Sequence, residues 1–249
     1  MATNLVSDEF SQRLVDDVFE IWVDPEMRAR GLEPVRESIT HALVELPPDG
    51  PVIVRLNDEV ELHARVRVTR SIEAGENILD SDVDSIDALL PGPTFNADAG
   101  WVALLRFREV LVVAFSFRYN RGRANALLDI ADQYLAVARY ALSVAHLHAT
   151  VENALAAAEL AVKAEMYLLA LEGEGHLNRI AWWEQWASLG NAPTELGKAV
   201  RPLYEVRGAA RYGDTQLALS AADGERSVAA VASIIDHARK EAHEGGVSC

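Results

Sequence analysis

Cysteine is almost absent from this sequence of 249 residues, because the single one, Cys249, is its last residue. With no second cysteine, an internal disulfide and a zinc site built on several cysteines are both excluded. Long apolar runs are also absent. The longest, around Val110–Phe115, has the length of a strand, whereas a membrane helix needs roughly 18 apolar residues or more. The segment Met1–Phe10 lacks the basic and apolar parts of a secretory signal. These absences predict a cytoplasmic protein with no membrane segment.

Basic residues are scarce as well. The chain has 23 Lys and Arg against 38 Asp and Glu, which gives a formal net charge of −15. The first 118 residues hold 22 of these acids and only 11 arginines. Binding to a phosphate backbone depends on clustered Lys and Arg that displace counterions. We therefore expect the N-terminal half to bind another protein rather than nucleic acid.

The usual signatures of metal and cofactor sites are missing. A calcium-binding loop within the acidic stretch Asp80–Asp87 would need Gly at position 85 and Glu at position 91, where this chain has Ser85 and Pro91. His146 and His148 are two residues apart with no third ligand nearby. No glycine-rich phosphate-binding loop and no Gly-x-Ser-x-Gly nucleophile motif occurs. The sequence predicts no metal site and no cofactor.

The N-terminal half combines two kinds of periodicity. Apolar residues recur every four positions in Ser7–Gly31 and again in Pro34–Leu46, which predicts two helices, the first interrupted at Asp24-Pro25. Strict alternation in Glu59–Arg70 predicts a half-buried strand, with Pro51–Leu56 as its partner.

Two further strands are predicted for Trp101–Phe107 and Val110–Phe117, which are rich in β-branched and aromatic residues. The stretch between the two strand pairs, Ser71–Gly100, contains Gly and Pro and is predicted to be a loop. Residues 1–118 are therefore interpreted as a small α+β domain with a mainly antiparallel sheet.

After residue 118 the composition changes to alanine-rich segments with helical periodicity. Short connections between these segments predict an up-and-down helical bundle over residues 119–249, with Trp182, Trp183 and Trp186 anchoring its core. Five helices are expected: Ala124–Leu142, Thr150–Leu171, His176–Leu189, Thr194–Ala210 and Glu225–His243.

Two short segments of this half carry a family resemblance. In the run Ala157–Ala164, Glu159 and Lys163 lie four residues apart among alanines and leucines. In Leu203–Asp214, an arginine near the end of a helix is followed by the turn Arg-Tyr-Gly-Asp. Both segments resemble motifs of the HEPN domain, and the resemblance covers about residues 119–243. The N-terminal half resembles no family that we recognise.

The resemblance implies an all-helical bundle that forms a two-fold homodimer, with polar motif residues near the dimer seam. Those binding candidates are Glu159, Lys163, Arg207, Arg211 and Asp214. Members of the family that cleave RNA carry an Arg followed, after four to six intervening residues, by a His. Here Arg207 is followed at that spacing by Tyr212, whose phenol is a poor base at neutral pH.

The sequence therefore favours a non-catalytic dimerisation and interaction module, which the resemblance sets in a bacterial defence or stress system. One alternative is a divergent metal-independent ribonuclease that uses Arg207 or Arg139 with a displaced partner such as His146. Arg139 and His146 would share a helix face if the helix continued between them. A second alternative is nucleotide or small-anion binding by Arg207 and Arg211.

Overall fold

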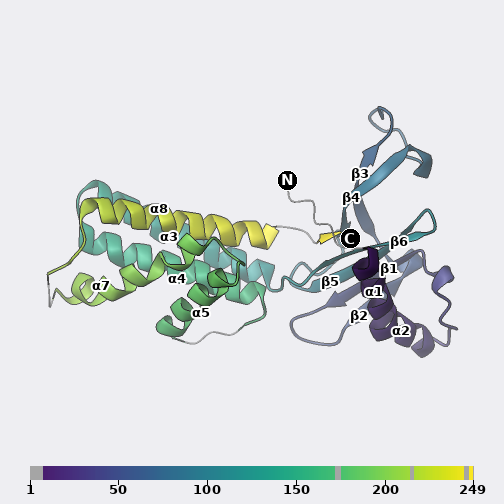
Figure 1. Ribbon diagram of the computed structural model, residues 1–249, viewed down its shortest axis with the longest axis horizontal. Helices are drawn as coiled ribbons and strands as arrows, with labels where there is room; N and C mark the ends of the chain where they lie inside the picture. Colours follow the sequence, from purple (N-terminus) through teal and green to yellow (C-terminus); the bar gives the residue numbers. More distant parts are fainter. Residues whose placement is uncertain (1–7, 172–174, 214–215, 244–246, 249) are drawn as a thin grey trace. The chain divides into compact units, whose positions relative to one another are not determined.

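The computed structural model describes residues 8–171, 175–213, 216–243 and 247–248 (Figure 1). The chain divides into two compact units. The first lies within residues 1–117 and includes the short strand β7 (Val247–Ser248). The second lies within residues 118–244. In the described part of the chain, no helix is both long and apolar enough to cross a membrane.

The first unit begins with a continuous helical segment that changes geometry midway. Helix α1 (Asp8–Val18) passes into a π-helical turn η1 (Phe19–Val23) and then into α2 (Asp24–Ala29). Pro25 lacks a backbone N–H, and its ring would crowd the carbonyl four residues earlier in an α-helix. The N–H of Asp24 instead donates to the carbonyl of Phe19, five residues back, so the chain stays helical with a local widening at the predicted interruption.

A five-stranded antiparallel sheet forms the centre of this unit, in the order β2-β1-β5-β6-β7. One face packs Ala42 and Val44 against Phe19 and Val23 of the helical segment. The opposite face, with Leu43, forms a smaller core. The strands are β1 (His41–Leu46), β2 (Ile53–Leu56), β5 (Gly100–Phe107), β6 (Val110–Ser116) and β7.

A separate two-stranded antiparallel ribbon is formed by β3 (Leu62–Val68) and β4 (Val83–Pro91). Leu89 of β4 is fully buried in the smaller core together with Trp101 and Ala103 of the large sheet. The predicted α+β class with small antiparallel sheets is thus confirmed for this half. Short 3-10 turns occur at Arg36–Ser38, Asn57–Glu59 and Asp80–Asp82.

The predicted helix Pro34–Leu46 is wrong. The segment contains a 3-10 turn and then β1, the second strand from the edge of the large sheet. Four consecutive residues of β1, Ala42–Glu45, are buried because both faces of the sheet are covered. A strand buried on both faces has no alternation of apolar and polar residues, so the sequence could not reveal it by period.

The predicted partner of the alternating strand is also wrong. Strand β2 pairs with β1, whereas β3 pairs with β4, which lies in the stretch predicted to be a loop. Register shifts interrupt the β3–β4 pairing on either side of Val66–Arg67. Such bulges break the two-residue period in the affected strands, which explains why β4 lacked a strand signal. The pair β5–β6, in contrast, was predicted correctly.

The second unit is a bundle in which α3, α4 and α8 run side by side (Figure 1). This confirms the predicted helical bundle; the fourth predicted helix is divided into α6 and α7. The helices are α3 (Arg121–Ser143), α4 (Leu147–Leu168), α5 (His176–Ser188), α6 (Thr194–Gly197), α7 (Val200–Tyr212) and α8 (Ala221–His243).

Helix α4 lies at the centre of the bundle and packs against α3, α5, α7 and α8. Small alanines such as Ala154, Ala158 and Ala161 are fully buried and let the neighbouring helices approach closely. Trp183 of α5 is fully buried, and its indole N–H donates to the carbonyl of Leu196 at 2.9 Å. This bond satisfies the polar atom that the buried ring carries.

Candidate functional site

The part of α4 that its neighbours leave uncovered forms one line along the helix. Because α4 is buried by four other helices, residues spaced by three or four positions on the remaining side share a single strip of surface. That strip begins at the N-terminal turn of the helix and contains both polar residues of the predicted motif. Its members are His148, Glu152, Ala156, Glu159 and Lys163, none of which is buried.

The C-terminal end of α7 contacts the start of this strip. Arg211 donates from Nε to the carboxylate of Glu152 at 2.9 Å, and its guanidinium forms an ion pair with the same group. The hydrogen bond that Arg211 donates to Glu152 raises the pKa of Arg211. One residue earlier, the carbonyl of Ala210 lies 3.0 Å from Nδ1 of His148. His148 and Arg211, which are far apart in sequence, thus both lie at the junction of α4 and α7, each with a partner on the other helix.

Arg207 lies one helical turn before Arg211 and so faces the same side of α7. It is half-buried, and its side chain has no hydrogen bond or ion pair within the ranges that the structure describes. Tyr212, at the position where a catalytic histidine would follow, is 69% exposed. Asp214, the last predicted binding residue, lies outside the described residues.

Glu159 and Lys163 border a hollow of about 330 Å³ between α3, α4 and α5. Lys163 also lies over the ring of Tyr167, with Nζ 5.5 Å from its centroid, and the guanidinium of Arg123 lies 3.9 Å from the same ring. The hollow combines apolar and charged side chains in its lining. It is lined by Ile130, Tyr134, Ala156, Glu159, Leu160, Lys163 and Arg179.

The candidate pair Arg139 and His146 does not share a helix face. Helix α3 ends at Ser143, and Ala145 in the following turn has a positive φ of 59°. His146 instead lines a groove of about 600 Å³ at the start of α4, together with His148 and the segment Gln216–Leu217. The pairing required a helix that continues from Arg139 to His146, and α3 ends before His146.

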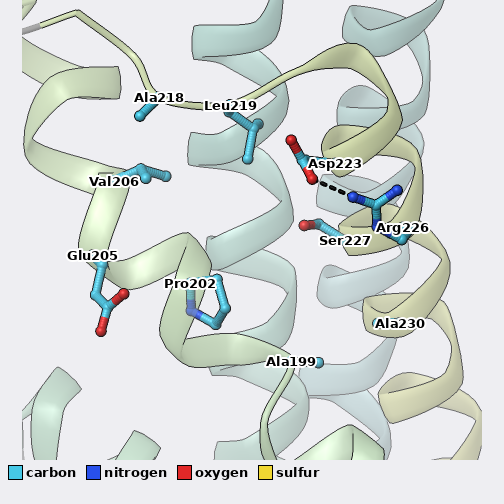
Figure 2. A pocket seen from close by; sticks show the side chains of 10 residues that line it. All are labelled: Ala199, Pro202, Glu205, Val206, Ala218, Leu219, Asp223, Arg226, Ser227 and Ala230. Atoms are coloured by element: carbon cyan, nitrogen blue, oxygen red, sulfur yellow. Dashed lines mark hydrogen bonds and ion pairs between the residues drawn. The ribbon is translucent and has the colours of Figure 1, made fainter.

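A third hollow, of about 500 Å³, lies between α7 and α8 and is lined by neither Arg207 nor Arg211 (Figure 2). Two of its lining residues, Glu205 and Asp223, are acidic. Its arginine, Arg226, is paired with Asp223, whose carboxylate also accepts hydrogen bonds from Ser220 at the start of α8. This hollow does not suit a phosphate or another anion, because its single cation is already neutralised.

Two acidic residues of the stretch Asp80–Asp87 have arginine partners. Asp82 accepts hydrogen bonds from Arg70, and Asp87 accepts one from Arg67. The bond from Arg70 lowers the pKa of Asp82. Among the described residues, no group of three or more His, Cys, Asp or Glu side chains is arranged to hold a metal ion.

Sequence reasoning missed a buried acid inside the bundle. Glu165 of α4 has no exposed surface, and burial raises its pKa to about 7. Its oxygens and the indole N–H of Trp186 are not aligned for a regular hydrogen bond, but the indole lies close enough to oppose the rise in the pKa of Glu165. The ion pair of Arg118 and Glu241 lies close enough to affect the pKa. The sequence offered one sign of this buried acid: a glutamate within the apolar run at the end of α4.

The architecture defines a class of protein: an acidic α+β unit followed by a helical bundle in which a polar strip on α4 contacts the motif end of α7. A comparison with family models then matches residues 124–241 to the HEPN domain. The C-terminal half of the chain therefore belongs to the HEPN domain family, as the two motif segments predicted. No family match covers the N-terminal part. A comparison with curated proteins gives no match.

Proposed function

We propose that the HEPN bundle acts as a non-catalytic dimerisation and interaction module. The observation that carries this proposal is the replacement of the expected imidazole by Tyr212, which points to solvent. An unperturbed phenol has a pKa near 10 and is mostly protonated at neutral pH. General-base catalysis works best when the pKa of the base is near the working pH. The position that would move the proton is thus occupied by a poor base.

The second cation of the motif is also engaged. Arg211 is held by Glu152, and a guanidinium already paired with a carboxylate is a weaker partner for a phosphate than a free one. Within the described ranges Arg207 has no hydrogen bond or ion pair, and Lys163 of the other motif segment contacts the ring of Tyr167. Two such cations on a chain with a net charge of −15 are a weak basis for holding RNA.

The test is an RNA cleavage assay on the full chain with labelled RNA in the presence of EDTA. We expect no cleavage above the level of an Arg207→Ala preparation purified in the same way. Cleavage by the wild-type chain that disappears in Arg207→Ala would overturn the non-catalytic proposal. Far-UV circular dichroism of both preparations confirms that a loss of activity does not come from unfolding.

The module is proposed to form a homodimer, and the acidic N-terminal unit is proposed to bind a protein partner. The setting, a bacterial defence or stress system, is supported by the family resemblance alone. Light scattering at tens of micromolar protomer tests the first part. A mass of 27 kDa, that of one chain, would contradict a homodimer.

A second candidate function is RNA cleavage, and the position of His148 favours it. If Nδ1 of His148 donates its proton to the carbonyl of Ala210, the other ring nitrogen, Nε2, is left as the base. This imidazole belongs to α4 rather than to the motif on α7. Its partner, the carbonyl of Ala210, belongs to the residue before Arg211. In this case His148→Ala should abolish the cleavage described above, whereas His146→Ala should leave it unchanged.

A further inference from the structure

Helix α3 carries a second apolar stripe that no part of the described bundle covers. Its buried face contains Leu128, Leu135 and neighbouring alanines, which form the core. A different side of the same helix, together with its C-cap residue, exposes five large apolar side chains, each more than two fifths accessible. They are Ile130, Tyr134, Val137, Tyr140 and Val144.

The spacing of this stripe is symmetric about Val137. Tyr134 and Tyr140 lie three residues on either side of it, and Ile130 and Val144 lie seven residues on either side. When two copies of a helix pack antiparallel about a two-fold axis, a residue ahead of the centre meets one equally far behind it in the partner. Ile130 of one copy would thus meet Val144 of the other, and Tyr134 of one copy would meet Tyr140 of the other.

The hollow beside the stripe provides a complementary feature. Ile130 and Tyr134 form part of its wall, and Lys163 of α4 is another lining residue. Tyr140 is 70% exposed and is the most exposed aromatic side chain of the stripe. With the axis at Val137, the ring of Tyr140 from one copy would approach the hollow beside Tyr134 of the other. The charged lining residues offer partners to the phenol hydroxyl, and the apolar ones pack against the ring.

We propose that the stripe Ile130–Val144 is the two-fold contact between two copies of this chain, with Tyr140 of each copy seated in the hollow of the other. This rests on the proposed function, because it names the surface of the homodimer. A stable interface buries roughly 800 Å² per partner. The proposed contact therefore extends from the stripe to uncovered residues of α4, such as Ala156 and Leu160.

The charges beside the stripe favour a second copy over a lipid surface. A helix that lies on a membrane carries Lys and Arg along the edges of its apolar face. On one side of the stripe lie Asp129 and Asp132, which are paired with Arg239 of α8, and on the other side Lys163 and Arg179 line the hollow. This border of mixed charge suits a protein surface better than an anionic membrane.

Cysteine cross-linking tests the axis directly. In a Cys249→Ser background, Val137→Cys places one thiol per copy at the proposed two-fold axis. The matched control is Arg139→Cys, which is exposed on α3 about 200° around the helix from Val137. Under mild oxidation at tens of micromolar protomer, we expect Val137→Cys to form a disulfide-linked dimer at least about tenfold faster than the control.

The outcomes separate the surface from the proposed function. Equal rates for the two variants in a chain that light scattering finds dimeric would refute this surface and leave the homodimer intact. A monomeric wild-type chain would refute both. For the seating of Tyr140, we expect Tyr140→Ala to raise the dimer dissociation constant at least about tenfold and Tyr140→Phe to raise it far less. A dissociation constant unchanged in Tyr140→Ala would remove the ring from the contact.

Discussion

The buried carboxyl of Glu165 makes the stability of the helical unit depend on pH in a direction that can be stated in advance. Burial is the main cause that raises its pKa from 4.5 to about 7; Arg118 acts in the opposite direction and Glu241 in the same one. A carboxyl group whose pKa is higher in the folded state binds its proton more tightly there. Its stabilising effect is fully present below pH 4.5 and is lost as the pH rises through 7.

The magnitude follows from the size of the shift. Each pKa unit corresponds to about 1.4 kcal/mol, so ionisation of Glu165 should lower the free energy of unfolding by about 3 kcal/mol between pH 4.5 and pH 9. Glu165→Gln keeps the shape of the side chain and cannot ionise. We expect this variant to have nearly the stability of the wild type at pH 5 and to exceed it by up to about 3 kcal/mol at pH 9.

The measurement is urea denaturation at a series of pH values, followed by far-UV circular dichroism at a fixed protomer concentration. Burial lowers the pKa of the nearby His237, which reduces stability as the pH falls below 6.5. Because this residue is present in both chains, the difference between them isolates Glu165. Glu195→Gln, at an exposed position of α6, is the matched control. A difference between Glu165→Gln and wild type that stays constant from pH 5 to pH 9 would refute the reasoning.

Three further predictions concern packing and charge, each measured as a free energy of unfolding. A Cβ at Gly197 would lie 2.6 Å from that of Ala187, so Gly197→Ala should destabilise the bundle by about 1–3 kcal/mol. Gly208→Ala on α7, where nothing lies within 4 Å of the added carbon, should instead stabilise it by up to about 1 kcal/mol; the same sign for both would contradict the packing argument. Arg55→Leu leaves Glu45, a buried residue of β1, without its ion-pair partner and should cost about 2–3 kcal/mol, most of which Glu45→Leu in the same chain should restore.

Helices with a local signal were predicted well from the sequence. In α3 the inward positions, including Leu128, Ala131 and Leu135, follow from a repeat of three or four residues, and all three are buried. The pair β5–β6 was equally accessible, because a short turn joins two runs of β-branched residues. The prediction failed for a strand whose pairing partner is distant in sequence. Strand β1 pairs with β5, about sixty residues later, and burial of both its faces removed the alternation that identifies a strand.

The candidate site shows the same division. Motif spacing proposed Arg207, Arg211, Glu159 and Lys163 as candidates, and it showed that Tyr212 stands where a histidine is expected. It did not show that Arg211 pairs with Glu152. That contact depends on the packing of α7 against α4, two helices separated by about thirty residues of chain.

Helix α3 shows most clearly what each level decides. Its composition makes it a helix, because residues along its whole length favour that conformation and the backbone hydrogen bonds are local. It is apolar on more than one side, however, so its sequence does not say which side faces the core. Packing against α4 and α8 buries the side with Leu128 and Leu135 and leaves the stripe centred on Val137 exposed. Burial is a property of what surrounds a residue, and only the assembled bundle supplies those surroundings.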